Sequence, residues 1–246
     1  MLVSIITPMY NSEATIAETI ESVLAQTYTK WEMVIVDDCS SDASESIVKS
    51  YQKKDARIQY YKRDKKSSIA SARNYAINLA KGHYLAFLDS DDLWEKDKLQ
   101  KQIDFMMQNN AGFCYSACAT IDEKSNKTGK IRNVKDYADY KILLKGNFIP
   151  CLTVVVEKKL FDKIEFPEIK HEDYAVWLSI LKTGVKAYGI NEVLAYYRVN
   201  SNSVSANKFK AALWTWNIYY NYEKIPFCKS VYYFINYFLR AVRKRL

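Results

Sequence analysis

The chain is poor in the residues that build disulfide scaffolds, zinc sites and fibrous structures. Its 246 residues include two histidines and five cysteines, with no CxxC pair among them. This usage argues against a disulfide framework and against a zinc site. Six glycines and four prolines leave no room for collagen-like or long-linker segments. The first ten residues contain neither a basic leader nor a small-residue cleavage site, so we expect a protein of the cytoplasm.

The chain contains enough apolar residues for a folded domain, and its charge is distributed unevenly along the sequence. Apolar residues make up 49% and charged residues 26%, which predicts one globular domain, or one domain with a small appendage. The net charge is +8, but six basic residues lie after Glu223, where there is no acid, so the first 223 residues are nearly neutral at +2. A nucleic-acid-binding protein usually spreads basic residues over a working face, and we therefore expect no nucleic-acid partner.

Apolar runs and amphipathic stretches alternate along the first half of the chain. Short apolar runs favour buried strands, and apolar residues at i, i+4, i+7 and i+8 favour helices. Strands separated by helices form right-handed βαβ units, so the pattern predicts an α/β fold with a mostly parallel sheet flanked by helices. Strands are expected at residues 2–7, 33–36, 58–61, 84–88, 153–156 and 185–190, and helices at 16–24, 47–51, 69–79, 99–106, 173–182 and in two aromatic-rich segments after residue 207.

Acidic residues follow two of the expected strands. Asp37 and Asp38 come after the second strand, and Asp89, Asp91 and Asp92 come after the fourth. Ligands of parallel sheets bind outside the carboxyl ends of the strands, so we expect these acids on one rim. Three carboxylates in four residues repel one another unless a cation lies among them, which suits Mg²⁺ or Mn²⁺. A solvated turn with Asp92 as the N-cap of a helix is the alternative.

Two later segments carry further candidate chemistry. The motif His171-Glu172-Asp173 opens an expected helix, where a carboxylate could act as a general base toward a hydroxyl nucleophile or could cap the helix. Arg198 precedes a segment rich in serine and asparagine, and an arginine with spaced hydroxyls suits a diphosphate. A polar surface loop is the alternative. The hydroxyls belong to Ser201, Ser203 and Ser205.

Five motifs taken together resemble the family-2 glycosyltransferases, nucleotide-sugar enzymes with the Rossmann-like GT-A fold. They occur in the family's order over residues 2–205, and five motifs in order at suitable spacing form a specific signature. The motifs are Thr7-Pro8-Met9-Tyr10-Asn11, Val36-Asp37-Asp38-Cys39-Ser40-Ser41-Asp42, Ala72-Arg73-Asn74, Asp89-Ser90-Asp91-Asp92 and His171-Glu172-Asp173.

The resemblance implies roles around the nucleotide-sugar donor. Asp38 would accept a hydrogen bond from the nucleobase, most often uracil, and Asp89 would contact the ribose. Asp91 would bind the metal ion, with Asp92 in support. The remaining donor-side residues would be Pro8 and Tyr10 beside the base, Arg73 near the nucleotide and the metal acids, and Arg198, Ser203 and Ser205 at the leaving diphosphate.

The resemblance also implies the reaction. Asp173 would be the catalytic base, and Glu172 would orient the base or the acceptor. The reaction would be an inverting displacement at the anomeric carbon of a UDP-sugar, with Mn²⁺ or Mg²⁺ and Arg198 taking up the charge of the leaving diphosphate. One departure from the family lies at residues 65–68, where Lys-Lys-Ser-Ser replaces the Gly-rich stretch of many relatives.

Residues 208–246 are expected to form a helical tail on a transferase domain of residues 1–207. Apolar residues recur there at helical spacing beside basic ones, which predicts an amphipathic helix at a membrane interface. The apolar run at 230–239 is too short to span a bilayer. A helix packed on the body is the alternative. The apolar positions are Val231, Phe234, Ile235, Phe238 and Val242.

Peripheral attachment to the cytoplasmic face of the membrane favours an acceptor that is presented there. By analogy with the family, we expect a growing glycan on a polyprenyl diphosphate, as in the synthesis of bacterial surface polysaccharide such as O-antigen or capsule. A polyprenyl monophosphate acceptor is one alternative. A non-catalytic protein that binds nucleotide sugars or glycans is another, which the presence of Asp91 and Asp173 disfavours. A two-metal nuclease or nucleotidyltransferase would need a basic cleft that the nearly neutral body does not supply.

Overall fold

Four parallel strands form the half of the sheet that the apolar runs predict. The computed structural model describes residues 1–199 and 208–243. In it β1 pairs in parallel with β2 and β4, and β2 pairs with β3. Every residue of β1 and β2 is buried, because helices cover both faces of the sheet. The strands are β1 (Val3–Met9), β2 (Trp31–Asp37), β3 (Ile58–Lys62), β4 (Tyr84–Phe87), β5 (Leu93–Trp94), β6 (Phe113–Ile121), β7 (Lys127–Arg132), β8 (Tyr137–Ala138), β9 (Val155–Glu157) and β10 (Ala187–Arg198).

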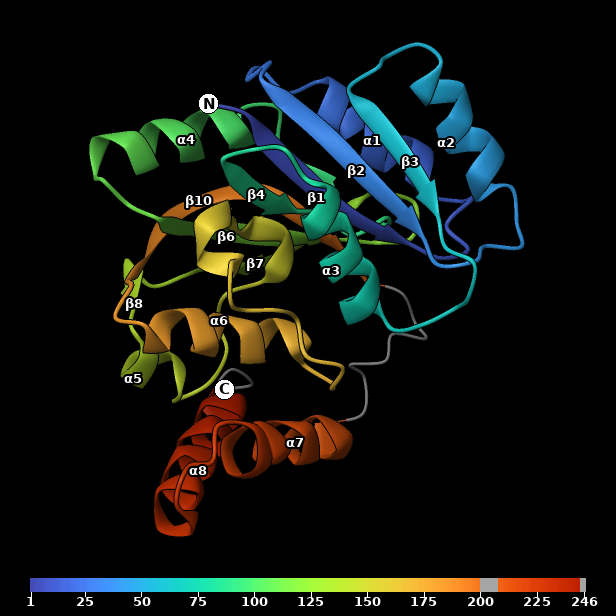
Figure 1. The fold of residues 1–246 in the computed structure, drawn as a ribbon. Coiled ribbons are helices and arrows are strands. Elements are labelled where there is room, and N and C mark those ends of the chain that lie inside the picture. Colours follow the sequence, from blue (N-terminus) through green and yellow to red (C-terminus); the bar gives the residue numbers. More distant parts are fainter. Residues whose placement is uncertain (200–207, 244–246) are drawn as a thin grey trace.

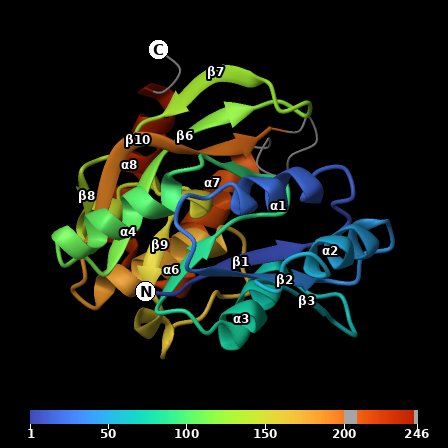
Figure 2. The same ribbon diagram turned by 90° about the horizontal axis from the view of Figure 1, so that it is seen from above.

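The second half of the chain extends the same sheet. Within the described residues the strand order is β3-β2-β1-β4-β9-β6-β10-β5, with β7 on β6 and β8 on β10. The short strand β9 runs antiparallel to both β4 and β6, and β10 runs parallel to β6. The hairpin of β6 and β7 lies on the side of the molecule away from β3 (Figure 2). The predicted α/β fold with a large, mostly parallel sheet is confirmed.

Three local expectations differ from the structure, each because long-range pairing decides the structure. The strand expected at 153–156 begins two residues later, as β9, because residues 151–153 form a 3-10 turn. The strand expected at 185–190 continues to Arg198, because β6 pairs with β10 along almost its whole length. Asp92 does not cap a helix, since residues 93–94 pair with β10 and the next helix begins at Lys98.

Helices cover both faces of the sheet (Figure 1). One core joins α1, α2 and α4 to one face, and a second joins α3 and α6 to the other. Two helices of the tail, α7 and α8, lie outside α6 (Figure 1). The helices are α1 (Ile16–Leu24), α2 (Ser44–Gln52), α3 (Ile69–Leu79), α4 (Lys98–Gln108), α5 (Tyr140–Leu143), α6 (Glu172–Lys182), α7 (Lys208–Asn217) and α8 (Phe227–Arg243), with 3-10 turns η1 (Cys151–Thr153) and η2 (Lys158–Phe161) and a π-helical turn η4 (Ile218–Tyr222).

The tail is attached to the body through the π-helical turn. Ile218 and Tyr219 are fully buried in the core that contains α6. The Tyr219 hydroxyl donates to the carbonyl of Leu144 (2.8 Å) and lies 3.1 Å from the hydroxyl of Tyr174 on α6. This part of the tail therefore packs on the body, as the alternative interpretation expected. The boundary at residues 207 and 208 stays a prediction.

The part of the chain that the structure describes contains no helix with the length and apolar content needed to cross a bilayer.

Candidate active site

The acids expected on one rim do lie at the carboxyl ends of neighbouring parallel strands. β2 ends at Asp37, and β4 ends two residues before Asp89, on either side of β1. Asp37 is fully buried and accepts hydrogen bonds from the Tyr60 hydroxyl (2.7 Å) and the Ser40 amide (2.8 Å). Asp37 therefore holds the turn in shape, and the nucleobase role expected for Asp38 remains a prediction.

The segment 65–68, where the chain departs from the family, contacts Asp38. The Ser67 amide donates to both carboxylate oxygens (2.9 and 3.0 Å), and the Ser67 hydroxyl donates to one of them (3.0 Å). An Arg63 nitrogen lies 3.9 Å from the same carboxylate. A nucleobase N–H that reaches Asp38 must share or replace the bonds from Ser67. The motifs pointed to neither Arg63 nor Ser67, because only the fold brings them to the end of β2.

The other two residues expected beside the base differ in exposure. Tyr10 is 43% exposed, and the Lys66 ammonium lies 3.6 Å from the centre of its ring. Pro8 is buried within β1, opposite Val36 of β2. The nucleotide roles of Pro8 and Tyr10 remain predictions.

The segment Asp89–Asp92, which we call the DxD turn, is held from one side by hydroxyls of α1. Thr15 and Thr19 donate to the carbonyl of Ser90 (2.9 and 3.1 Å), and Thr19 also lies 3.0 Å from the carbonyl of Asp92. The Ser12 and Ser90 hydroxyls are 2.7 Å apart. These contacts could not be predicted from the motif, because the motif does not specify which helix packs behind it.

Two carboxylates of the DxD turn, Asp91 and Asp92, lie in surroundings that disfavour a negative charge. Burial and the neighbouring Asp89 charge raise the pKa of Asp91 to about 6. Burial also raises the pKa of Asp92 well above its usual range, and one of its carboxylate oxygens has no hydrogen-bond partner. A bound cation would relieve both effects. Among the described residues no three acidic, histidine or cysteine side chains are close enough to form a metal site alone. The turn therefore fits Mg²⁺ or Mn²⁺ held by one carboxylate and completed by substrate phosphates and water.

Arg73 connects the DxD turn to the start of α6. Its guanidinium is 3% exposed and lies 2.7 Å from both Asp89 and Glu172, which are 83 residues apart. A fixed guanidinium fork holds two carboxylates in one orientation. Arg73 therefore sets the distance between Asp89 and the segment that carries Asp173.

Asp173 lies in the first turn of α6, after His171 in a left-handed conformation (φ 60°). Burial, together with the neighbouring charge of Glu172, raises the pKa of Asp173 to about 7. The Tyr174 amide donates to one carboxylate oxygen (2.7 Å), and the Asn147 side chain lies 3.4 Å from the other. A carboxylate with a pKa near the working pH is suited to remove a proton from a hydroxyl group.

The raised pKa of Asp173 predicts a pH-dependent rate. The carboxylate must be unprotonated to accept a proton, and its folded-state pKa is about 7. We therefore expect kcat/KM for the acceptor, at saturating donor and metal, to rise with pH up to about 7 and then to level off. The profile is measured by product formation between pH 5.5 and 8.5. A rate that is constant over this range would contradict the role of Asp173 as base.

Arg198 does not lie in a surface loop as the alternative for this segment expected. It is the last residue of β10 and is 3% exposed. Its guanidinium contacts the backbone carbonyl of Asp91 (2.7 Å) and the carboxylate of Glu18 (2.7 Å). Ser201, Ser203 and Ser205 lie outside the described residues, so the diphosphate roles of Ser203 and Ser205 remain predictions.

Comparisons with known proteins identify the family of the chain. The family model of glycosyl transferase family 2 matches residues 4–164. The chain is 44% identical over 246 residues to the putative teichuronic acid biosynthesis glycosyltransferase TuaG of Bacillus subtilis (strain 168), covering all of this chain and 98% of that one. It is 39% identical over 244 residues to WfgD of Escherichia coli, a UDP-Glc:alpha-D-GlcNAc-diphosphoundecaprenol beta-1,3-glucosyltransferase, covering 99% of this chain and 94% of that one.

Solved structures share the fold. The mannosyltransferase PcManGT from Pyrobaculum calidifontis, in complex with GDP-Man and Mn²⁺, matches with a TM-score of 0.73 at 20% identity, over 91% of this chain and 64% of that one. The motifs, the GT-A architecture and the relatives lead to one assignment. The chain belongs to glycosyltransferase family 2 and is a glycosyltransferase.

Proposed function

We propose that the protein transfers a sugar from a UDP-sugar, with inversion, to a sugar hydroxyl of a polyprenyl-diphosphate-linked acceptor in the synthesis of a bacterial surface polysaccharide. The observation that carries the proposal is the bridge from Asp89 through Arg73 to Glu172, which joins the donor-side turn to the helix of the base. The named substrates of WfgD support both substrate classes. UDP-glucose and a lipid-diphosphate-linked N-acetylglucosamine are therefore the first pair to test.

The residues suggest how such a transfer proceeds. Asp173 takes the proton from the acceptor hydroxyl, whose oxygen attacks the anomeric carbon from the face opposite the diphosphate. The glycosidic bond forms as the bond from carbon to the β-phosphate oxygen breaks, and the electron pair stays on the leaving UDP. Mn²⁺ or Mg²⁺ at Asp91 would neutralise the charge on the diphosphate. The leaving group needs no proton, so one base is sufficient.

The test is release of UDP from a panel of sugar nucleotides with Mn²⁺, with acceptors that separate the alternatives. One acceptor is a synthetic lipid diphosphate that carries N-acetylglucosamine, and the other is the bare lipid monophosphate. Release with the first acceptor alone supports the proposal. Release with the second alone establishes a polyprenyl-monophosphate transferase. Metal-dependent donor binding without release with either acceptor would contradict the proposed acceptor.

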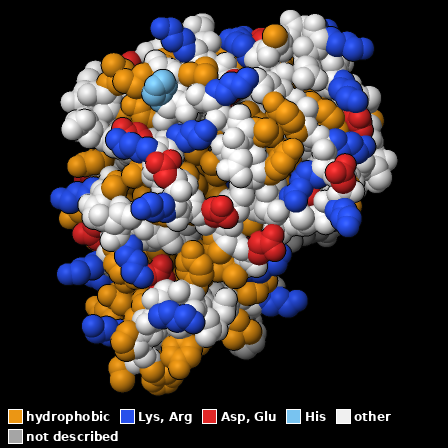
Figure 3. Space-filling view, in the orientation of Figure 1, with side chains coloured by type: hydrophobic (Ala, Val, Ile, Leu, Met, Phe, Trp, Pro, Cys, Tyr) orange, Lys and Arg blue, Asp and Glu red, His pale blue; other side chains and the backbone are white. Residues whose placement is uncertain are grey.

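The outer surface of the tail supports an attachment to the membrane. Large apolar side chains there are between 45% and 61% exposed, and orange side chains gather over the lower part of the molecule in Figure 3, where α7 and α8 lie. Lys224 and Lys229 are exposed on the same part of the chain. Aromatic side chains enter the headgroup boundary while lysines meet anionic lipid. The apolar residues are Leu213, Tyr220, Phe227, Tyr232, Ile235 and Phe238.

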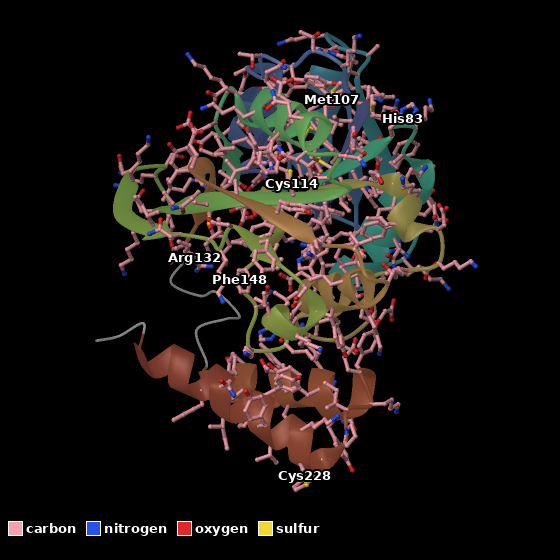
Figure 4. All side chains as sticks on the ribbon, turned by 90° about the vertical axis from the view of Figure 1, so that its left-hand side faces the viewer. His83, Met107, Cys114, Arg132, Phe148 and Cys228 are labelled. Carbon is pink, nitrogen blue, oxygen red and sulfur yellow. The ribbon has the colours of Figure 1, made fainter. Side chains whose placement is uncertain are left out.

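We expect the double variant Ile235→Ser/Phe238→Ser to bind anionic vesicles at least about tenfold more weakly, because each apolar side chain contributes more than 1 kcal/mol when buried. Co-sedimentation with phosphatidylglycerol vesicles measures this affinity. The control is Met107→Ser/Ile131→Ser, whose side chains are equally exposed (58% and 57%) but lie off the tail. Met107 on α4 and Cys228 on α8 are at opposite ends of the molecule (Figure 4). Equal binding by both double variants would contradict attachment through the tail.

A further inference from the structure

Arg198 contacts three separate segments of the protein, namely the DxD turn, the turn between β6 and β7, and α1. Its Nε donates to the carbonyl of Asp91 (2.7 Å), and its backbone amide donates to the carboxylate of Asp92 (2.9 Å). The turn between β6 and β7 provides further acceptors for Nη1, at the Ser125 hydroxyl (2.9 Å) and the carbonyls of Asp122 (3.3 Å) and Glu123 (3.2 Å). Nη2 lies 2.7 Å from Glu18 on α1. Every guanidinium nitrogen therefore has a protein partner.

These contacts place a cation directly behind the DxD turn. Three carboxylates stand within four residues and repel one another, and Asp92 is buried, where an unpaired charge is costly. The hydroxyls of Thr15 and Thr19 hold the turn from α1, but they bring no charge. Arg198 supplies a positive charge next to the turn, where its guanidinium contacts both the Asp91 carbonyl and Glu18 of α1. Its contact to the turn is made through the Asp91 carbonyl, which leaves the Asp91 carboxylate free of this guanidinium.

We propose that Arg198 is a positioning residue that acts as the resident counter-ion of the DxD turn, and that Glu18 holds it there, so that the turn is already in its metal-binding shape before donor and metal arrive. This role differs from the one implied by the family resemblance, in which Arg198 contacts the leaving diphosphate. It rests on the proposed function to the extent that the turn binds a metal–diphosphate complex.

A variant of Glu18 can distinguish whether Arg198 positions the turn or binds the diphosphate. Glu18 contacts Arg198 but lies on α1, outside the motif. Its side chain is 51% exposed, and it also accepts a hydrogen bond from Ser125. If Arg198 positions the turn, removal of Glu18 loosens the guanidinium and weakens metal-dependent donor binding. If Arg198 instead binds the diphosphate, removal of Glu18 frees it for that task, and donor binding stays equal or becomes tighter.

The experiment measures the affinity for UDP by calorimetry, with Mn²⁺ and with EDTA, for the wild type and for Glu18→Ala. We expect the affinity in Mn²⁺ to fall about threefold to tenfold, because a hydrogen bond to a charged group is lost, with little change in EDTA. We also expect the donor KM to rise more than kcat falls. Glu21→Ala is the control, because Glu21 lies on the same helix and accepts from Tyr51 instead.

A second variant guards against a general loss of stability in Glu18→Ala. Ser125 has φ of 63°, a conformation that glycine adopts without strain, so Ser125→Gly removes the hydroxyl from Glu18 and Arg198 while the turn is kept. We expect a smaller loss in the same direction. Unchanged or tighter UDP binding in Mn²⁺ by Glu18→Ala would overturn the proposal. Absence of Mn²⁺-dependent binding by the wild type would instead refute the proposed function.

Discussion

Asp173→Asn is expected to lower kcat by about 10²- to 10⁴-fold, the range that general base catalysis contributes. The amide has the shape of the carboxylate, but it cannot take up the proton of the acceptor hydroxyl. Donor binding should be unchanged, because Arg73 binds Asp89 and Glu172 and makes no bond to Asp173. UDP release with acceptor, and calorimetry with UDP and Mn²⁺, measure the two quantities.

The stability of the same variant separates a catalytic from a structural role. The pKa of Asp173 is raised from 3.8 to about 7, so folding favours its protonated form, and this contribution is lost as pH rises toward and past 7. At pH 8 the neutral asparagine should therefore leave the unfolding temperature equal or higher. A lower unfolding temperature together with lost UDP binding would show that Asp173 supports the fold and not the chemistry.

Removal of the metal ion or of its ligand is expected to have an effect of similar size. Neutralising the charge of a leaving diphosphate is worth several kcal/mol, so Asp91→Asn and EDTA should each lower turnover by about 10²- to 10⁴-fold. In the wild type, UDP affinity should fall when Mn²⁺ is replaced by EDTA. In Asp91→Asn, the affinity should be low in both conditions, because no carboxylate holds the ion beside the diphosphate.

Asp97→Asn provides a matched control for this prediction. Asp97 lies six residues after Asp91 and pairs with Lys101 on α4, away from the DxD turn. It should keep the full response to Mn²⁺. If Asp91→Asn also keeps that response, then Asp91 is not the metal ligand, and another acid of the turn has to be tested in its place.

The candidate site was predictable to the extent that it follows from local motifs. Asp38, Asp89, Asp91 and Asp173 stand in short, recognisable stretches, and the order of strands predicts that the first three share one rim. What surrounds them was not predictable. Ser67 bonds to Asp38 through a segment that departs from the family pattern.

The tail shows the same limit. Its apolar spacing predicted a helix, and a helix is present in α8. The spacing could not decide between a surface helix and a packed one, because both need an apolar face. In the structure the π-helical turn before α8 is packed on the body, since Tyr219 bonds to the body beside α6. The outer face remains available for the proposed membrane contact.

By itself the sequence determined the parallel strands β1 to β4, the helices between them and the acids at their ends, because these depend on apolar runs and periodicity within about a dozen residues. The tertiary structure alone decided that Arg73 joins Asp89 to Glu172, and that β10 carries Arg198 to the back of the DxD turn. Those contacts join residues far apart in the chain. Their geometry depends on strand pairing and buried charge, which no local pattern encodes.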